Sequence, residues 1–176
     1  NKNIKITCDG GAATGKSTGA KLIAKKYGLS FLSSGLLYRY ATYLLIKYKP
    51  KNRISFLRKK FQNLNYNKIK KINLHTQLVS KNAAIIAKIR PVRNILKNYQ
   101  IKFIKKNKGC VLEGRDASTK IMPNSDVKFF FICSLNIASR RIFKKLKKKQ
   151  KKITFKEVKK ALHERNMLDI KRKISP

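Results

Sequence analysis

A glycine-rich segment near the start of the chain constrains its fold more than any other feature. Residues 10–17 read G-G-A-A-T-G-K-S and match the pattern G-x-x-x-x-G-K-[ST], the phosphate-binding P-loop. An alternating, β-branched run at about 3–8 predicts a buried strand before the loop, and apolar residues at helical spacing over about 16–27 predict a helix after it. A strand, a glycine-rich loop and a helix in this order indicate an α/β nucleotide-binding fold.

The residue types of the loop suit a polyphosphate. Its backbone N–H groups would form a nest for anions, and the positive end of the following helix dipole would add to that field. Lys16 is expected to reach the β- and γ-phosphates, and the Ser17 hydroxyl to bind Mg²⁺. The residues expected to hold the triphosphate here are Gly10, Gly11, Ala12, Ala13, Thr14, Gly15, Lys16, Ser17 and Thr18. The motif defines a ligand class and leaves the reaction open.

Strands and helices alternate along the rest of the chain. Further strands are predicted at about 29–32, 110–113 and 127–133, and helices at about 35–45, 76–106 (broken at Pro91), 137–146 and 154–163. The lysine- and asparagine-rich stretch 48–74 has poor periodicity and is interpreted as a connector or small insertion. The run Phe129–Phe131 is expected in the core. The alternation predicts an α/β fold with a three-layer, doubly wound parallel sheet.

Length and composition favour one globular domain. The chain has 176 residues, of which 42% are hydrophobic. We find neither a secretory pattern nor an apolar run long enough to span a bilayer, so we expect a cytoplasmic protein without a membrane partner. The isolated cysteines Cys8, Cys110 and Cys133 are predicted to be buried free thiols rather than metal ligands.

The formal net charge of +38 raises the question of a nucleic-acid partner. The lysines are spread along nearly the whole chain, which argues against such a partner. The tract 144–152 is the exception. It fits a solvated face, a cationic patch that attracts phosphate near a triphosphate site, or a nucleic-acid-binding segment.

Arginines are few against this lysine background. A guanidinium binds phosphate in a bidentate way that an ammonium cannot, so a phosphoryl acceptor that carries its own phosphate would need such residues. This favours a nucleoside monophosphate as acceptor. Ser34, Arg115 and Asp116 follow predicted strand ends, where doubly wound sheets bind ligands. Ser34 also fits a helix N-cap, Asp116 a strand-end ion pair with Arg115, and Arg141 a solvated cation.

Six segments in the same order resemble the bacterial cytidylate kinases, which are nucleoside monophosphate kinases. They are residues 9–18, 33–39, 90–93, 113–119, 123–130 and 164–176, and together they extend over nearly the whole chain. The first, D-G-G-A-A-T-G-K-S-T, is similar to the family's D-G-P-A-A-S-G-K-S-T, and the fourth, E-G-R-D-A-S-T, to its D-G-R-D-I-G-T. The resemblance implies phosphorylation of CMP, and of dCMP, by ATP with Mg²⁺ in a monomeric enzyme.

The resemblance also implies roles for individual residues. Arg93 and Asp116 would read the cytosine edge, Asp169 would accept from the ribose hydroxyls, and Arg141 would belong to a mobile lid over ATP. The catalytic set would be Lys16, Arg115, Arg165 and Arg172. The acceptor-binding set would be Ser34, Arg39, Arg93, Arg115, Asp116, Arg165, Asp169 and Arg172. We expect a single domain over 1–176, with a monophosphate-binding insertion at about 34–95 and a lid at about 141–172.

Two other functions fit the sequence. One is a nucleoside monophosphate kinase of other or broader base preference, since Ala84 and Leu168 stand where the family has a serine beside the cytosine site and a lid arginine. The other is a P-loop protein that binds RNA through its lysines without turnover. The sequence given ends at Pro176, where the family continues into a strand and a helix, so these two elements are expected to be absent.

Overall fold

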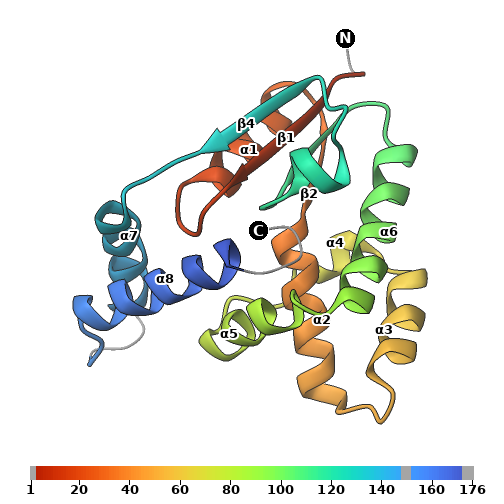
Figure 1. Ribbon diagram of the computed structural model, residues 1–176. Coiled ribbons are helices and arrows are strands. Elements are labelled where there is room, and N and C mark those ends of the chain that lie inside the picture. The colour runs from red at the N-terminus through yellow and green to blue at the C-terminus, as the bar shows by residue number, and fades with distance from the viewer. Residues whose placement is uncertain (1–2, 148–151, 172–176) are drawn as a thin grey trace.

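Four parallel strands form one sheet in the computed structural model, which describes residues 3–147 and 152–171. The strands are β1 (Lys5–Gly10), β2 (Ser30–Ser33), β3 (Cys110–Glu113) and β4 (Val127–Phe131), in the spatial order β2-β3-β1-β4. β1 pairs with β3 on one side and β4 on the other. The carboxyl ends of the strands therefore lie at one edge of the sheet, where the P-loop begins (Figure 1).

Helices cover both faces of the sheet. On one face, α1 (Lys16–Lys26) buries Ala20 and Ala24 against a cluster that includes Cys8 and Val111 of the strands. On the other face, α2 (Ser34–Tyr48) and α6 (Arg90–Lys106) share an apolar cluster with Leu112 of β3. Val111 and Leu112 are neighbours and point to opposite faces, as the pleat of a strand requires. The prediction of a three-layer, doubly wound α/β fold is confirmed.

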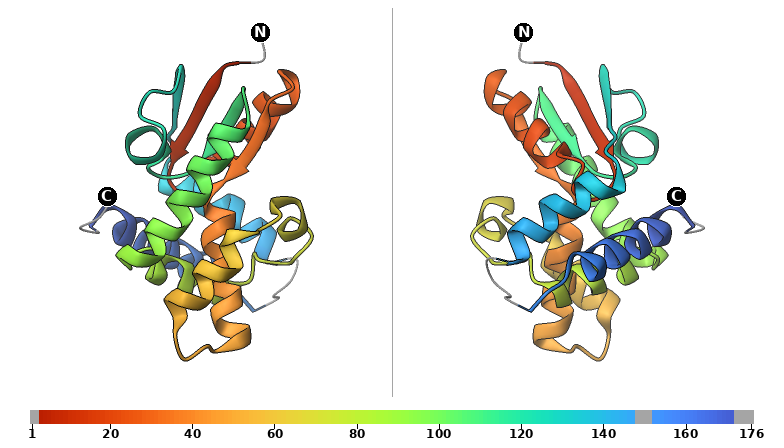
Figure 2. Two further views of the ribbon diagram at one scale, coloured as in Figure 1. Left: turned by 90° about the vertical axis from the view of Figure 1, so that its right-hand side faces the viewer. Right: turned by 90° about the vertical axis from the view of Figure 1, so that its left-hand side faces the viewer.

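Two groups of helices lie beyond the carboxyl ends of the strands. The first contains α2, α3 (Arg53–Gln62), α4 (Tyr66–Ile69), α5 (Gln77–Ile86) and α6. The second is the pair α7 (Leu135–Lys147) and α8 (Phe155–Ile170), which pack against each other. α8 also contacts α5, so the two groups meet below the sheet (Figures 1 and 2).

Of the two interpretations of residues 48–74, the connector is wrong, and the small insertion stays a prediction. This stretch contains α3 and α4. The Asn52 side chain caps α3 by accepting from the Ser55 N–H at 2.9 Å, and Leu57 and Phe61 are buried one turn apart. Only one narrow stripe of α3 faces the core, and cationic and polar residues occupy the rest, so its helical period is hard to detect in the sequence.

The expectation that Phe129–Phe131 lie in the core is also wrong for two of the three rings. β4 is the edge strand of the described sheet, and the exposed fraction is 43% for Phe129 and 72% for Phe130. Phe131 packs against the cluster between the sheet and α1. An apolar run predicts a strand, but it does not show how many neighbours that strand has.

The other predicted elements are present with small shifts at their ends. The break expected near Pro91 separates α5 from α6, and Pro91 stands in the first turn of α6, where its missing N–H costs no helical hydrogen bond. A short π-helix, η1 (Ala117–Ile121), follows β3. In the part of the chain that the structure describes, no helix combines the length and the apolar character that crossing a bilayer requires.

Candidate active site

The P-loop is shaped by residues with a positive φ. Gly10 ends β1 with φ 143°, and a Cβ built on it would lie 2.3 Å from the Phe131 carbonyl oxygen, so no other residue fits. Ala13 has φ 60°, and Gly15, with φ 96°, immediately precedes α1. The Thr14 hydroxyl donates to the Gly11 carbonyl at 3.2 Å. The loop thus turns directly into the N-terminus of α1, as phosphate-binding loops do.

Lys16 lies beside the carboxyl end of β3. Its ammonium donates to the Gly11 carbonyl at 3.1 Å and lies 3.2 Å from Oε1 of Glu113, the last residue of β3. Burial lowers the pKa of Lys16, the Glu113 carboxylate opposes that shift, and the charge of Arg115 adds to it. The other Glu113 oxygen accepts from the Ser33 hydroxyl. The sequence analysis missed Glu113 as a site residue, although it is only 3% exposed and holds the ammonium of the P-loop lysine.

Three arginines from different elements join Lys16. Arg39 comes from α2, Arg115 follows β3, and Arg165 comes from α8. We call Lys16, Arg39, Arg115 and Arg165 the cationic corner. Arg115 pairs with Asp169 at 2.7 Å, and one Arg39 nitrogen donates to the Gly35 carbonyl at 3.1 Å. The structure therefore gathers four of the predicted site cations at the strand ends, and Asp169 with them.

The cationic corner holds more positive charge than its carboxylates balance. The buried Nε atoms of Arg39 and Arg165 have no hydrogen-bond partner among the described residues. Burial, and then the charges of Arg39 and Arg115, lower the pKa of Arg165 to about 10 against the opposing effect of Asp169. Glu113 and Asp169 are the carboxylates that pair with members of the corner. Crowded cations with unused donors are suited to an anion with several oxygens.

A second part of the site is balanced in charge. The Arg93 guanidinium, from the first turn of α6, pairs with the Asp116 carboxylate, and both residues are only 8% exposed. Arg93 also donates to the Ala87 carbonyl at 3.2 Å, and its guanidinium lies 5.9 Å from the centre of the Tyr38 ring. We call Arg93 and Asp116 the paired corner. Because Asp116 pairs with Arg93, the alternative of a strand-end ion pair with Arg115 is not what the structure shows.

Asp9, which the sequence analysis did not select, fixes the segment after Asp116. Its carboxylate accepts from the N–H groups of Ala117 at 2.9 Å and Ser118 at 2.7 Å, and from the Ser118 hydroxyl at 2.6 Å. Asp9 is 2% exposed and belongs to β1, directly before the P-loop. One strand thus ends in the loop and also positions the backbone that carries Asp116.

Ser34 is the first residue of α2 and is buried. Ser33 is the N-cap, since its side chain accepts from the Leu36 N–H at 3.4 Å. The Ser34 hydroxyl donates to the Gln100 side chain of α6, which donates in turn to the Leu96 carbonyl at 3.1 Å. Ser34 is therefore free of the capping role, and its hydroxyl contacts α6. Gln100 could not have been found from the sequence, because a buried glutamine in an amphipathic helix carries no motif.

The remaining predicted site residues divide into three groups. Arg141, on α7, donates to the Ala13 carbonyl of the P-loop at 3.3 Å, so α7 does reach the loop. Ser17 and Thr18 are exposed in the first turn of α1. Arg172 lies outside the described residues.

Cys8 and Cys110 are buried free thiols as predicted, whereas Cys133 is half-buried.

A parallel α/β sheet that ends in a P-loop, opposed by arginines from separate helices, defines a P-loop phosphotransferase of the nucleoside monophosphate kinase type. The comparisons agree. The family model described as cytidylate kinase matches residues 6–176. The chain belongs to the cytidylate kinase family, and the family predicted from the sequence is confirmed.

Relatives support this assignment, and one solved structure shares the fold. A protein of Fusobacterium nucleatum named cytidylate kinase is 35% identical over an alignment of 189 positions. The alignment covers 99% of this chain and 84% of that protein. A protein of the same name from Mesomycoplasma hyopneumoniae is 34% identical, over 99% of this chain and 82% of its own length. The crystal structure of an uncharacterized protein from Eubacterium ventriosum shares the fold, with a TM-score of 0.50 and 15% identity over 96% of this chain and 77% of that one.

Proposed function

We propose that the protein transfers the γ-phosphate of ATP to CMP and dCMP, giving ADP with CDP or dCDP. The observation that carries the proposal is the cationic corner, in which the Nε atoms of Arg39 and Arg165 are buried without partners beside the P-loop lysine. An acceptor phosphate and a migrating phosphoryl group would supply the oxygens that these donors need. The family membership supports the same reaction.

On the donor side, the segment from Gly10 to Thr18 would hold the triphosphate of ATP through backbone N–H groups and Lys16. Glu113 holds the Lys16 ammonium at the strand ends, close to where the chain enters α1. The exposed Ser17 hydroxyl is suited to give one oxygen ligand to Mg²⁺. The described residues contain no group of three acidic, histidine or cysteine side chains that could hold the ion alone, so it would enter with ATP. When bound there, the ion neutralises phosphate charge.

On the acceptor side, the paired corner would read the base. A carboxylate accepts a hydrogen bond from the exocyclic amine of cytosine, whereas uracil presents a carbonyl at that position. Asp116 would be that acceptor, with Arg93 and Ser34 beside it. The insertion at about 34–95 would carry this part of the site. Arg172, which the structure does not describe, is proposed to act with Arg115 and Arg165 on phosphate.

Transfer in such a site needs positioning and charge stabilisation rather than a covalent or acid–base group. Lys16, Arg115 and Arg165 would stabilise the charge on the phosphoryl group as it moves in line between its two partners. The segment at about 141–172, which contains Arg141 and α8, would close over the nucleotides. Closure would exclude water, so ATP would not be hydrolysed before the acceptor arrives.

A product assay tests the proposal. The full chain is incubated with ATP, Mg²⁺ and CMP, and the nucleotides are separated by anion exchange. We expect ADP and CDP in equal amounts, and we expect Lys16→Ala to lower kcat by about 10²–10³ or more. The matched control is Lys21→Ala, an exposed lysine of α1, which should keep the wild-type rate. ADP formation without CDP, or no turnover with any monophosphate, would contradict the proposal.

We further propose that the enzyme works as a monomer on free nucleotides in the cytoplasm. The proposal rests on the family resemblance and on the wide spread of its lysines, since neither points to a macromolecular partner. Size-exclusion chromatography with light scattering is expected to give one species near the chain mass of 20.3 kDa. A stable dimer would contradict it.

A further inference from the structure

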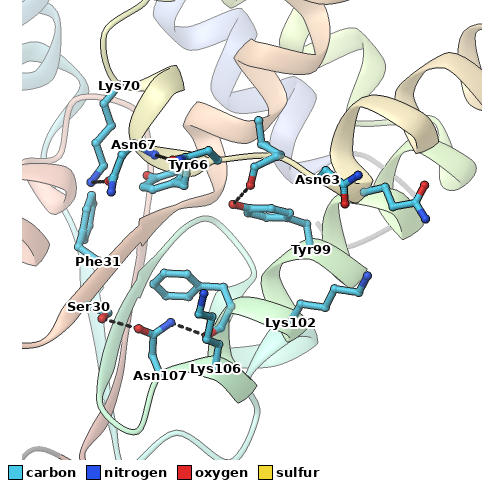
Figure 3. A pocket seen from close by; sticks show the side chains of 14 residues that line it. Ser30, Phe31, Asn63, Tyr66, Asn67, Lys70, Tyr99, Lys102, Lys106 and Asn107 are labelled. Carbon is cyan, nitrogen blue, oxygen red and sulfur yellow. Dashed lines mark hydrogen bonds between the residues drawn. The ribbon is translucent and has the colours of Figure 1, made fainter.

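A groove lies apart from the candidate active site and shares no lining residue with it. It has a volume of about 660 Å³ and opens between the start of β2, the segment from the end of α3 to α4, and the second half of α6 (Figure 3). This volume is in the range of sites that bind small molecules. Its lining residues are Ser30, Phe31, Gln62, Asn63, Leu64, Asn65, Tyr66, Asn67, Lys70, Tyr99, Lys102, Phe103, Lys106 and Asn107.

The lining has an unusual composition for a surface groove. Four aromatic rings come from three separate elements: Phe31 from β2, Tyr66 from α4, and Tyr99 and Phe103 from α6. Five side-chain amides and three lysines complete the wall, and none of the lining residues is acidic. Rings offer stacking surfaces, amides pair with heterocycle edges, and lysines attract phosphate, so the three kinds together match one ligand class.

Part of this wall is fixed and part is free. The Tyr99 hydroxyl donates to the Leu64 carbonyl at 3.1 Å, and the Ser30 hydroxyl donates to Asn107 at 2.6 Å. In contrast, Lys102 and Lys106 are exposed, one turn apart on α6, and form no ion pair with a described carboxylate. The rings are therefore held in place, while the two ammonium groups are available to a ligand.

We propose that this groove is a second nucleotide site, which binds a nucleoside phosphate distinct from the substrates in the active site. The base would lie against the half-buried rings of Phe31, Tyr99 and Phe103, since Tyr66 is only 8% exposed. The phosphates would lie against Lys102 and Lys106, which are both exposed. Lys70 is already engaged, since it donates to Asn67 at 2.9 Å and lies 4.9 Å from the centre of the Tyr66 ring.

The fixed wall connects the groove to the candidate active site. The Tyr66 hydroxyl accepts from the Ser33 N–H at 2.8 Å, and the Ser33 hydroxyl donates to Glu113, which pairs with Lys16. A ligand that shifts Tyr66 would therefore move the carboxylate that holds the P-loop lysine. Occupation of the groove is expected to change the KM for ATP through these contacts.

The binding test uses the full chain with its active site filled. A bisubstrate analogue that joins adenosine to cytidine through five phosphates is added in excess, and UTP or GTP is then titrated by calorimetry. We expect at least one of them to bind with a Kd below about 100 µM. The double variant Lys102→Glu/Lys106→Glu should weaken this binding at least about tenfold. The matched control Lys97→Glu/Lys105→Glu changes the same charge on exposed α6 positions outside the groove and should bind as the wild type does.

Three results would overturn the proposal of a second site. UTP and GTP could both fail to bind up to about 1 mM, or both double variants could weaken their binding equally. Inorganic triphosphate could also bind as tightly as UTP or GTP. An RNA oligonucleotide that binds more tightly than either, with a steep salt dependence, would assign the groove to nucleic acid instead. The groove variants leave the cationic corner unchanged, so loss of binding is independent of whether CMP is phosphorylated.

The variant Tyr66→Phe tests the link to Lys16. It keeps the ring and removes the hydroxyl that accepts from Ser33. The bound nucleotide should change the KM for ATP in the wild type and leave it unchanged in Tyr66→Phe, although binding is the same in both. An equal response of the two proteins would overturn the link.

Discussion

The cationic corner and the paired corner meet at the strand ends, where Arg115 and Asp116 are neighbours, but they differ in charge balance. In the paired corner, Arg93 and Asp116 are almost fully buried and neutralise each other. In the cationic corner, Arg165 is half-buried beside other cations, and its buried Nε has no hydrogen-bond partner among the described residues. Folding alone would favour the first arrangement, because a buried charge without a partner is destabilising.

On the proposed function, the paired corner serves both the fold and the base, whereas the excess cations of the other corner serve phosphate alone. A neutral pair can present directional hydrogen bonds to an uncharged base and still stabilise the free protein. An excess of cations stabilises the protein only when phosphate is bound. The two corners should therefore respond to the same type of substitution with opposite changes in stability.

The largest effect is expected from Arg93→Met. This change leaves the Asp116 carboxylate buried without its partner, and the free energy of unfolding should fall by about 3–5 kcal/mol. Chemical denaturation measures it, with Arg90→Met as the control, because Arg90 is exposed at the start of the same helix. A loss below about 1 kcal/mol would place the pair in a far more solvated setting than the structure shows.

Arg165→Met should lower kcat for CMP by about 10²–10³, since it removes one donor aimed at developing phosphate charge. Arg165→Lys keeps the charge and loses the planar fork, so its kcat should lie between those of the wild type and Arg165→Met. Arg140→Met, on an exposed position of α7, is the control for general loss of charge. A kcat within about threefold of the wild type would remove Arg165 from the catalytic set.

Asp116→Asn should reduce the preference for CMP over UMP, measured as the ratio of their kcat/KM values. An amide can donate as well as accept, so the discrimination should fall by about 1–3 kcal/mol. The ratio is its own control, because a smaller fraction of folded protein lowers both values equally. An unchanged ratio would mean that Asp116 serves only to neutralise Arg93.

The smallest effect concerns β1, the strand that leads into the P-loop. Burial, and then the charges of Glu113 and Asp9, raise the pKa of the Cys8 thiol from 9.0 to about 12. Between these values the folded protein holds a proton that the unfolded chain loses. Between pH 9 and 10 this contribution to stability therefore falls, by at most about 1.4 kcal/mol. Denaturation at several pH values should show a shallower decline in Cys8→Ala, and parallel curves would contradict the prediction.

The sequence predicted the parts of the fold that carry strong local patterns. The P-loop, its flanking strand and helix, and the break at Pro91 are all encoded within a few residues. The helix α3 was missed because only Leu57 and Phe61 are fully buried in it. The exposure of Phe130 was missed because strand order is a property of the whole chain, and no local pattern identifies an edge strand.

The residues of the candidate site also divide into those that a local pattern reveals and those that depend on distant contacts. Lys16 and Asp116 were predicted because they stand in recognisable segments, and the structure brings them to one edge of the sheet. Asp9 and Glu113 stand in the same segments, but their roles depend on contacts with residues far along the chain, such as Ser118 and Lys16. The sequence contained these carboxylates without showing what they hold.

The thermal stability of Arg165→Met in the absence of nucleotide tests most directly whether Arg165 is kept for phosphate. If Arg165 is kept for phosphate, its removal relieves repulsion from Arg39 and Arg115, and the variant should unfold at the same temperature as the wild type or a higher one. With ATP and CMP analogues bound, the wild type should gain more than the variant. A variant that loses stability without nucleotide, as Arg93→Met is expected to do, would show that Arg165 is held by a structural pair, and would contradict the account.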